Sequence, residues 1–233
     1  MDKKSEMSQQ GMKSLMNKII AKFSFVPIFL GLFILVPAGT FNYWQVYVYF
    51  AVLIVPMIFV LFYFLRTDPK FLERRTNFKE KEKQQSLIAF LSAFVFLAGF
   101  IISGFDHRFG WSNIPIYSVF SADIIIFLGY LIIFIVFKQN SYASNIIEVN
   151  ENQNVISTGL YGIVRHPMYV GVIIMFVPTP IALGSYWGLI PFALLPVSLV
   201  LRILNEEKVL SENLKGYKEY CQKTKYRLIP FLW

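Results

Sequence analysis

Six apolar runs, separated by short polar stretches, dominate the pattern of this 233-residue chain. They cover about residues 23–38, 44–65, 87–102, 118–137, 167–183 and 187–204. A helix that crosses a bilayer needs about 20 apolar residues. The second, fourth and sixth runs approach or meet that length, whereas the others are short and require tilt, bilayer thinning or burial in a bundle. The pattern predicts an all-α fold, a polytopic membrane helical bundle with five to six transmembrane segments.

The last two runs are joined by only three residues, Gly184, Ser185 and Tyr186. So short a connection predicts antiparallel neighbours, a helical hairpin over 167–204. The hairpin either crosses the membrane or re-enters on the side from which it came. We expect residues 1–137 to form N-terminal transmembrane helices with a loop at 66–86. Residues 138–233 then form a second region with a polar loop, the hairpin, and a cytoplasmic C-terminal helix and tail.

The distribution of positive charge predicts the orientation. With the N-terminus inside, the inner stretches 1–22, 66–86, 138–165 and 202–233 hold 21 of the 22 Lys and Arg residues, and only Arg108 lies outside. Such a bias is the positive-inside pattern, so both termini are expected in the cytoplasm. Since 56% of residues are hydrophobic and 15% charged, the net charge of +8 suits anionic lipid better than nucleic acid.

A few single residues limit the chemistry further. Asp68 and Pro69 form a helix-start signal in the inner loop, which is either a short surface helix or a solvated charged linker. Cys221 is the only cysteine, which excludes an intramolecular disulfide. With two histidines besides, His107 and His166, we expect no metal site.

Arg165 and His166 stand directly before Pro167, at the mouth of the fifth apolar run. Pro favours the first helical position, so the pair lies at a helix N-terminus, where backbone N–H groups and the helix dipole favour anions. Ionisable groups at membrane depth are functional candidates. The alternative is that Arg165 reaches lipid phosphates and His166 only caps the helix, and for the pair alone we favour that alternative.

A second polar cluster, Arg202, Glu206 and Glu207, closes the sixth run. Arg202 and Glu206 are four residues apart and share a helix face, so they form an ordinary ion pair or part of a pocket. The hairpin brings Arg165 and His166 beside this cluster, because residues 167 and 204 end adjacent antiparallel helices. Arg with one or two Glu suits a zwitterionic ligand, and nearby tyrosines can stack on a heterocycle.

The second half of the chain resembles the isoprenylcysteine carboxyl methyltransferase family of integral membrane enzymes. The matching residues are Gly159–Tyr161, Arg165–Gly171, Arg202 with Glu206 and Glu207, Gly216–Tyr220 and Pro230. The resemblance implies that S-adenosylmethionine is bound by Gln153, Asn154, Val155, Ile156, Tyr161, His166, Tyr169 and Glu206. We expect the intervening Arg165, Pro167 and Met168 to belong to the same cofactor site. The resemblance also implies that Arg202 lies at the acceptor carboxylate. We expect Arg202, Glu206 and Glu207 to be the catalytic residues.

The resemblance and these residues together predict carboxyl O-methylation of a lipid-attached or isoprenoid-like acceptor. A carboxylate is already an anion and needs no base, so alignment and desolvation of the two ligands suffice. Three alternatives stay open: phospholipid N-methylation with Glu207 or His166 as base, a sterol-type membrane reductase using a nicotinamide cofactor, and a non-enzymatic transporter or scaffold. The expected location is the bacterial cytoplasmic membrane, and the expected partners are membrane lipids. The sequence does not predict an oligomeric state.

Overall fold

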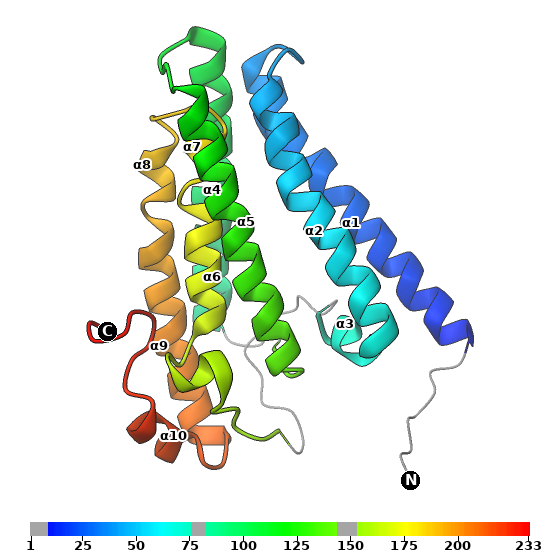
Figure 1. Ribbon diagram of the computed structural model, residues 1–233, viewed down its shortest axis with the longest axis vertical. Coiled ribbons are helices and arrows are strands. Elements are labelled where there is room, and N and C mark those ends of the chain that lie inside the picture. Colours follow the sequence, from blue (N-terminus) through cyan, green and yellow to red (C-terminus); the bar gives the residue numbers. More distant parts are fainter. Residues whose placement is uncertain (1–8, 76–82, 144–152) are drawn as a thin grey trace.

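The computed structural model describes residues 9–75, 83–143 and 153–233, and the elements in these ranges are all helical. Parts of the inner loop and of the polar loop, residues 76–82 and 144–152, lie outside the described residues. Figure 1 shows long helices side by side, with the start of α1, the short α3 and α10 at one end. The longer elements are α1 Gln9–Ala38, α2 Trp44–Thr67, α4 Lys83–Phe109, α5 Ile116–Gln139 and α9 Leu195–Asn213.

Among the described residues, four helical stretches are long and apolar enough to cross a membrane: Trp44–Thr67, Gln85–Phe109, Ile116–Gln139 and Leu189–Asn213. Two shorter apolar helices, Phe25–Ala38 and Pro167–Ala182, complete the six runs. The polytopic helical bundle is therefore confirmed, and the chain is an integral membrane protein. The expectation that the third run is short was wrong. Its helix continues through polar residues at both ends, and some of them, such as Gln85 and Asp106, are buried and accept hydrogen bonds from other side chains.

Both arms of the C-terminal hairpin are interrupted by proline. The first arm is α6 Pro167–Phe176 followed by α7 Thr179–Ala182, and the second is α8 Leu189–Phe192 followed by α9. Proline lacks the N–H that an uninterrupted helix needs. Pro178 stands between α6 and α7, and Pro196 stands in the first turn of α9, directly after the second break. The hairpin and its tight turn are nevertheless present as predicted.

A buried polar cluster fixes that turn at the end of the bundle opposite α10. Gly184 adopts φ +75°, a left-handed conformation that glycine tolerates best. Asp106 of α4 is almost fully buried and accepts hydrogen bonds from the hydroxyls of Ser185 (2.5 Å) and Ser112 (2.7 Å). The turn is thereby tied to α4, and the two arms return side by side to the other end.

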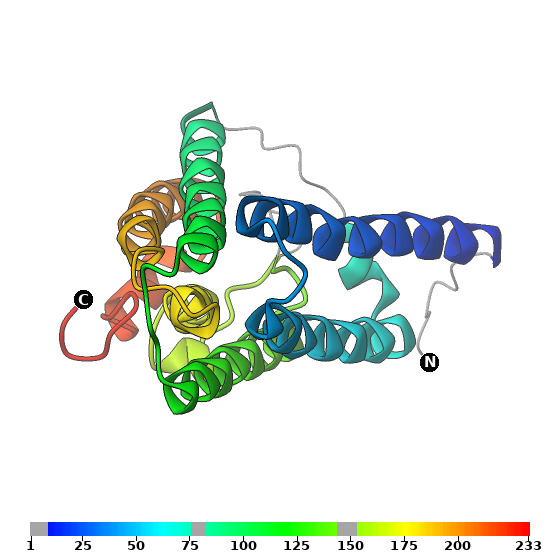
Figure 2. The ribbon, with the colours of Figure 1, turned by 90° about the horizontal axis from the view of Figure 1, so that it is seen from above.

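Helix α6 is the central element of this half of the molecule. Seen from above, it lies among α4, α5 and α9 (Figure 2). A Cβ added to Gly129 of α5 would come within 2.8 Å of the Gly171 carbonyl oxygen, and one added to Gly171 would come within 3.0 Å of the Gly129 carbonyl oxygen. Two facing glycines let the backbones approach as small residues do in membrane bundles. This packing sets the position of the α6 N-terminus.

The start signal in the inner loop is confirmed as a helix. Helix α3, Pro69–Arg75, begins after Asp68, whose side chain accepts a hydrogen bond from the Phe71 backbone N–H (3.1 Å). Phe71 and Leu72 are buried against α2 and α5. The alternative of a solvated linker is therefore wrong for this segment. Because Phe71 is anchored in the core, the basic end of α3 is held against the bundle.

Candidate active site

The N-terminus of α6 is held in place by the C-terminal tail. Pro167 occupies the first helical position, and His166 is the N-cap with φ −124°. The backbone N–H of Arg165 donates to the Tyr226 carbonyl (2.9 Å), and that of His166 donates to the Arg227 carbonyl (3.0 Å). The His166 side chain makes no capping hydrogen bond, so the idea that it only caps the helix was wrong.

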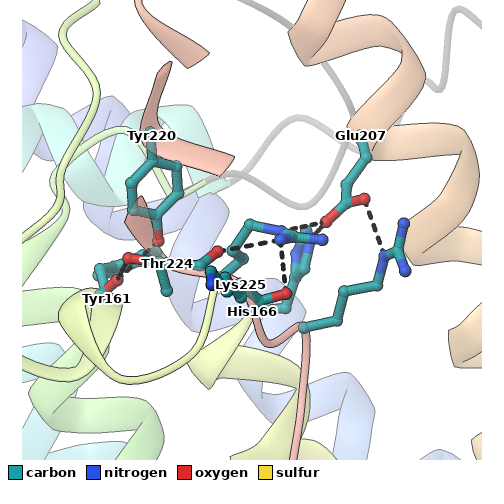
Figure 3. Close-up of polar contacts among 8 residues, drawn as sticks. Tyr161, His166, Glu207, Tyr220, Thr224 and Lys225 are labelled. Atoms are coloured by element: carbon teal, nitrogen blue, oxygen red, sulfur yellow. Dashed lines mark hydrogen bonds and ion pairs between the residues drawn. The ribbon is translucent and has the colours of Figure 1, made fainter. Parts of the chain in front are cut away.

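Glu207 is the centre of a buried cluster of ion pairs (Figure 3). One carboxylate oxygen accepts from Arg165 Nε (2.7 Å) and lies 3.1 Å from His166 Nε2, and the other accepts from Arg227 Nε (2.9 Å). Arg165 also donates to the carbonyls of Thr224 and Lys225, both at 2.9 Å. Burial alone would lower the pKa of the Arg165 guanidinium, but the hydrogen bond with Glu207 raises it.

This cluster confirms that the two polar groups of the hairpin meet. Arg165 is 8% exposed, so it does not reach out to lipid phosphates. Glu207 does not line the cavity described below, and its two oxygens are engaged by two guanidiniums and an imidazole. Its geometry is that of a positioning residue that joins α9, α6 and the tail, rather than of a group facing a ligand.

Glu206, by contrast, faces a second network through Tyr169. The Tyr169 hydroxyl donates to Glu206 Oε2 at 2.6 Å and accepts from Arg202 Nε at 2.9 Å. The side-chain amide of the fully buried Gln85 also lies against Arg202, and with its oxygen turned toward the guanidinium it accepts from Nη1 at 2.7 Å. A tyrosine from the other arm of the hairpin thus bridges Arg202 and Glu206. Their spacing of four residues had suggested a direct ion pair or part of a pocket.

A polar cavity lies between the loop before η1 Gly159–Gly162, the start of α6, and α9 with α10 Tyr217–Lys223. Glu206 contributes a carboxylate to its wall, and Tyr161 contributes an aromatic ring and a hydroxyl. All the residues expected to bind cofactor line it: Gln153, Asn154, Val155, Ile156, Tyr161, Arg165, His166, Pro167, Met168, Tyr169 and Glu206, together with Arg202. Every predicted site residue except Glu207 therefore lines this cavity, and Glu207 contacts Arg165 and His166 from behind it.

Other lining residues were not anticipated from the sequence. Asn140 donates to the Tyr161 hydroxyl (2.9 Å), and Tyr220 donates to the Tyr161 carbonyl (2.7 Å). Burial raises the pKa of Tyr161 to about 12, so its phenol is neutral at physiological pH. Tyr217 also lines the cavity, and burial together with nearby Glu207 raises the pKa of its phenol. Tyr217 and Tyr220 belong to the Gly216–Tyr220 match, which was the available signal for them.

A second cavity of about 340 Å³ lies between α4, α6 and α9. Its walls are mainly apolar, with Phe96, Ile173 and Leu199 among them. Met168, Tyr169 and Arg202 line both cavities, so the two meet at the start of α6. No pattern in the sequence indicated this second cavity, because its lining residues look like ordinary membrane-facing positions.

The region that forms the site is similar in sequence to known membrane proteins. Residues 117–216 match the family model described as phospholipid methyltransferase, and this range includes α5, α6 and α9. An 81-residue stretch is 31% identical to the mouse (Mus musculus) protein Delta(14)-sterol reductase TM7SF2, covering 33% of this chain. The chain spans only 19% of that protein's length. The site region is thus similar to membrane methyltransferases, a group that includes the isoprenylcysteine carboxyl methyltransferases.

Proposed function

We propose that this chain is an integral membrane methyltransferase that binds S-adenosylmethionine in the polar cavity and an amphiphilic acceptor in the apolar one. The observation that carries the proposal is the meeting of the two cavities at Met168, Tyr169 and Arg202. A charged donor and a lipid acceptor need one water-accessible and one lipid-like site with a common boundary. In the same proposal both termini lie on the cytoplasmic side of a bacterial cytoplasmic membrane.

The residues of the polar cavity fit S-adenosylmethionine. Its ammonium group suits the Glu206 carboxylate, which lines the cavity within reach of Tyr169. Its carboxylate suits the His166 end of α6, where the helix dipole is positive. The rings of Tyr161, Tyr217 and Tyr220 offer stacking faces for adenine. When bound, the cofactor supplies a methyl group on a sulfonium, which is transferred without a general base if the acceptor is an anion.

Carboxyl O-methylation is the reaction we favour, with Arg202 holding the acceptor. A carboxylate oxygen forms the new bond to the methyl carbon with its own lone pair, and the carbon–sulfur electron pair returns to sulfur, so no proton moves. Arg202 can hold a carboxylate with two parallel N–H donors at the boundary of the two cavities. The protein aligns the two groups and keeps water from them.

Phospholipid N-methylation is a second candidate, because the family model that matches the chain is the phospholipid one. An amine acceptor must lose a proton, and the base must face the ligands. Glu207 does not line the polar cavity and is held by two guanidiniums and an imidazole, whereas Glu206 and His166 line the cavity, so one of these two would serve as the base. The sterol-reductase similarity makes reduction with a nicotinamide cofactor a third candidate.

Calorimetry on the detergent-purified protein tests the proposal. S-adenosylmethionine should bind, NADPH should not, and Glu206→Gln should weaken donor binding by roughly tenfold, because one charge-assisted hydrogen bond to the ammonium is lost. The matched control is Glu212→Gln, an exposed glutamate on the same helix, which should bind as the parent does. Binding of NADPH without S-adenosylmethionine would refute the methyltransferase proposal. A screen of prenylcysteine and phospholipid acceptors with labelled donor then separates O- from N-methylation.

A further inference from the structure

Two consecutive arginines end α3, and only one of them faces the apolar cavity. Arg74 donates to the Ser141 carbonyl through Nε (3.1 Å) and Nη2 (2.7 Å), and it lies 3.8 Å from Asp68. Arg75 lines the apolar cavity, where Arg202 is also found. These two cavity-lining guanidiniums come from parts of the chain more than 100 residues apart, so their convergence is a property of the tertiary structure.

The position of Arg75 is fixed by its neighbours. Its guanidinium carbon lies 4.3 Å from the centre of the Phe137 ring, and Nη1 donates to the Ala143 carbonyl (3.2 Å). The adjacent Phe71, 1% exposed, anchors α3 in the core. A planar cation stacked on an aromatic ring is held in one orientation, which is the condition for recognising a planar or tetrahedral anion.

Arg75 remains charged in this apolar setting. Burial lowers the pKa of its guanidinium to about 10, while the nearby phenols of Tyr130, Tyr169 and Tyr161 oppose that shift. It is therefore protonated at neutral pH. A second positive charge beside an apolar cavity raises the local potential for anions, because field lines are poorly screened where water is scarce.

We propose that Arg75 is a second acceptor-binding residue, which together with Arg202 holds the anionic group of an amphiphile whose apolar chain occupies the cavity. The proposal rests on the proposed function for the identity of the cavity as the acceptor site. It adds that the acceptor class is an amphiphile with a carboxylate or phosphate head, and that α3 contributes directly to selectivity. A neutral amphiphile of equal length leaves both guanidiniums without a ligand charge and binds less well.

Photolabelling of the full chain in phosphatidylcholine nanodiscs tests this assignment. The probes are hexadecanoate and hexadecanol, each with the same diazirine in its chain, and labelled peptides of α4 and α9 are quantified by mass spectrometry. The parent protein should prefer the acid. Arg75→Gln should lower acid labelling by roughly tenfold, towards the level of the alcohol, because one charge-assisted contact is lost. Arg74→Gln is the matched control and should keep the preference.

The result that would overturn the proposal is equal labelling of the parent by acid and alcohol, or an unchanged preference in Arg75→Gln. Arg75→Lys retains the charge without the planar fork and should retain part of the preference. An unfolding midpoint of Arg75→Gln equal to that of the parent shows that its loss of preference is not a failure to fold. Donor binding is measured by calorimetry on the same samples. An acid preference that depends on Arg75 in a protein that binds no S-adenosylmethionine would support the anion site and reject the methyltransferase proposal.

Discussion

Replacing Glu207 by Gln is the most informative single change, because it removes the charge at the centre of the buried ion-pair cluster without altering side-chain size. Arg165 and His166 have side chains only 7% and 4% exposed, so water cannot replace the lost carboxylate. Arg227 is 31% exposed and is partly rescued by solvent. The amide can keep one accepting oxygen near Arg165, but its NH2 group then faces another donor.

The loss of stability in Glu207→Gln can be estimated from these contacts. Removing one partner of a buried ion pair costs about 3–5 kcal/mol. Because the amide retains one accepting oxygen and Arg227 is partly exposed, we expect the free energy of unfolding to fall by the lower end of this range, about 3 kcal/mol. For a chain of this size, each kcal/mol lowers the unfolding midpoint by about 2–4 °C, which gives a decrease of about 10 °C. The C-terminal tail should loosen as well, because Arg165 also binds the carbonyls of Thr224 and Lys225.

Thermal unfolding followed by tryptophan fluorescence in detergent measures this decrease, and calorimetry measures donor affinity on the same samples. We expect Glu207→Gln to lower both, since His166 lines the polar cavity and depends on the cluster for its position. Glu206→Gln should lower donor affinity with little change in the midpoint. Glu212→Gln, exposed on the same helix, should change stability by less than about 0.5 kcal/mol. A midpoint of Glu207→Gln within about 2 °C of the parent would refute the reasoning.

Further predictions concern the acceptor, the bridge, the packing and the tail. Arg202→Lys should still bind donor but lose most methyl transfer to a carboxylate, because lysine lacks the two parallel N–H donors of the guanidinium. Full turnover in an acceptor assay would indicate that the methyl acceptor is an amine. Tyr169→Phe should weaken donor binding and turnover together, since its hydroxyl bridges Glu206 and Arg202. In thermal unfolding, Gly129→Ala should cost about 1–3 kcal/mol, because its Cβ would lie 2.7 Å from a backbone nitrogen of α6; no loss would contradict the close packing. Burial raises the pKa of the Cys221 thiol, so little thiolate is present at pH 7 and maleimide should label Cys221 slowly. Labelling should be faster in Glu207→Gln, in which we expect the tail to loosen.

Much of the fold could be predicted from the sequence because solvation is a local property of the chain. Each apolar run contributes to the helices that the structure shows, since a backbone in lipid must satisfy its own hydrogen bonds. Local chemistry also marked the helix starts at Pro69 and Pro167 and the turn at Gly184. The three-residue turn was enough to predict that Arg165 and His166 meet the cluster on α9.

Only the tertiary structure decided what each charged residue faces. Glu206 and Glu207 are neighbours in sequence, but successive helical residues point about 100° apart. Packing of α6 and the tail against α9 therefore turns Glu206 to the polar cavity and Glu207 into the ion-pair cluster. The same packing inserts Tyr169 between Arg202 and Glu206 and brings Arg75 to the apolar cavity. These contacts join distant segments, so spacing along the chain could not determine them.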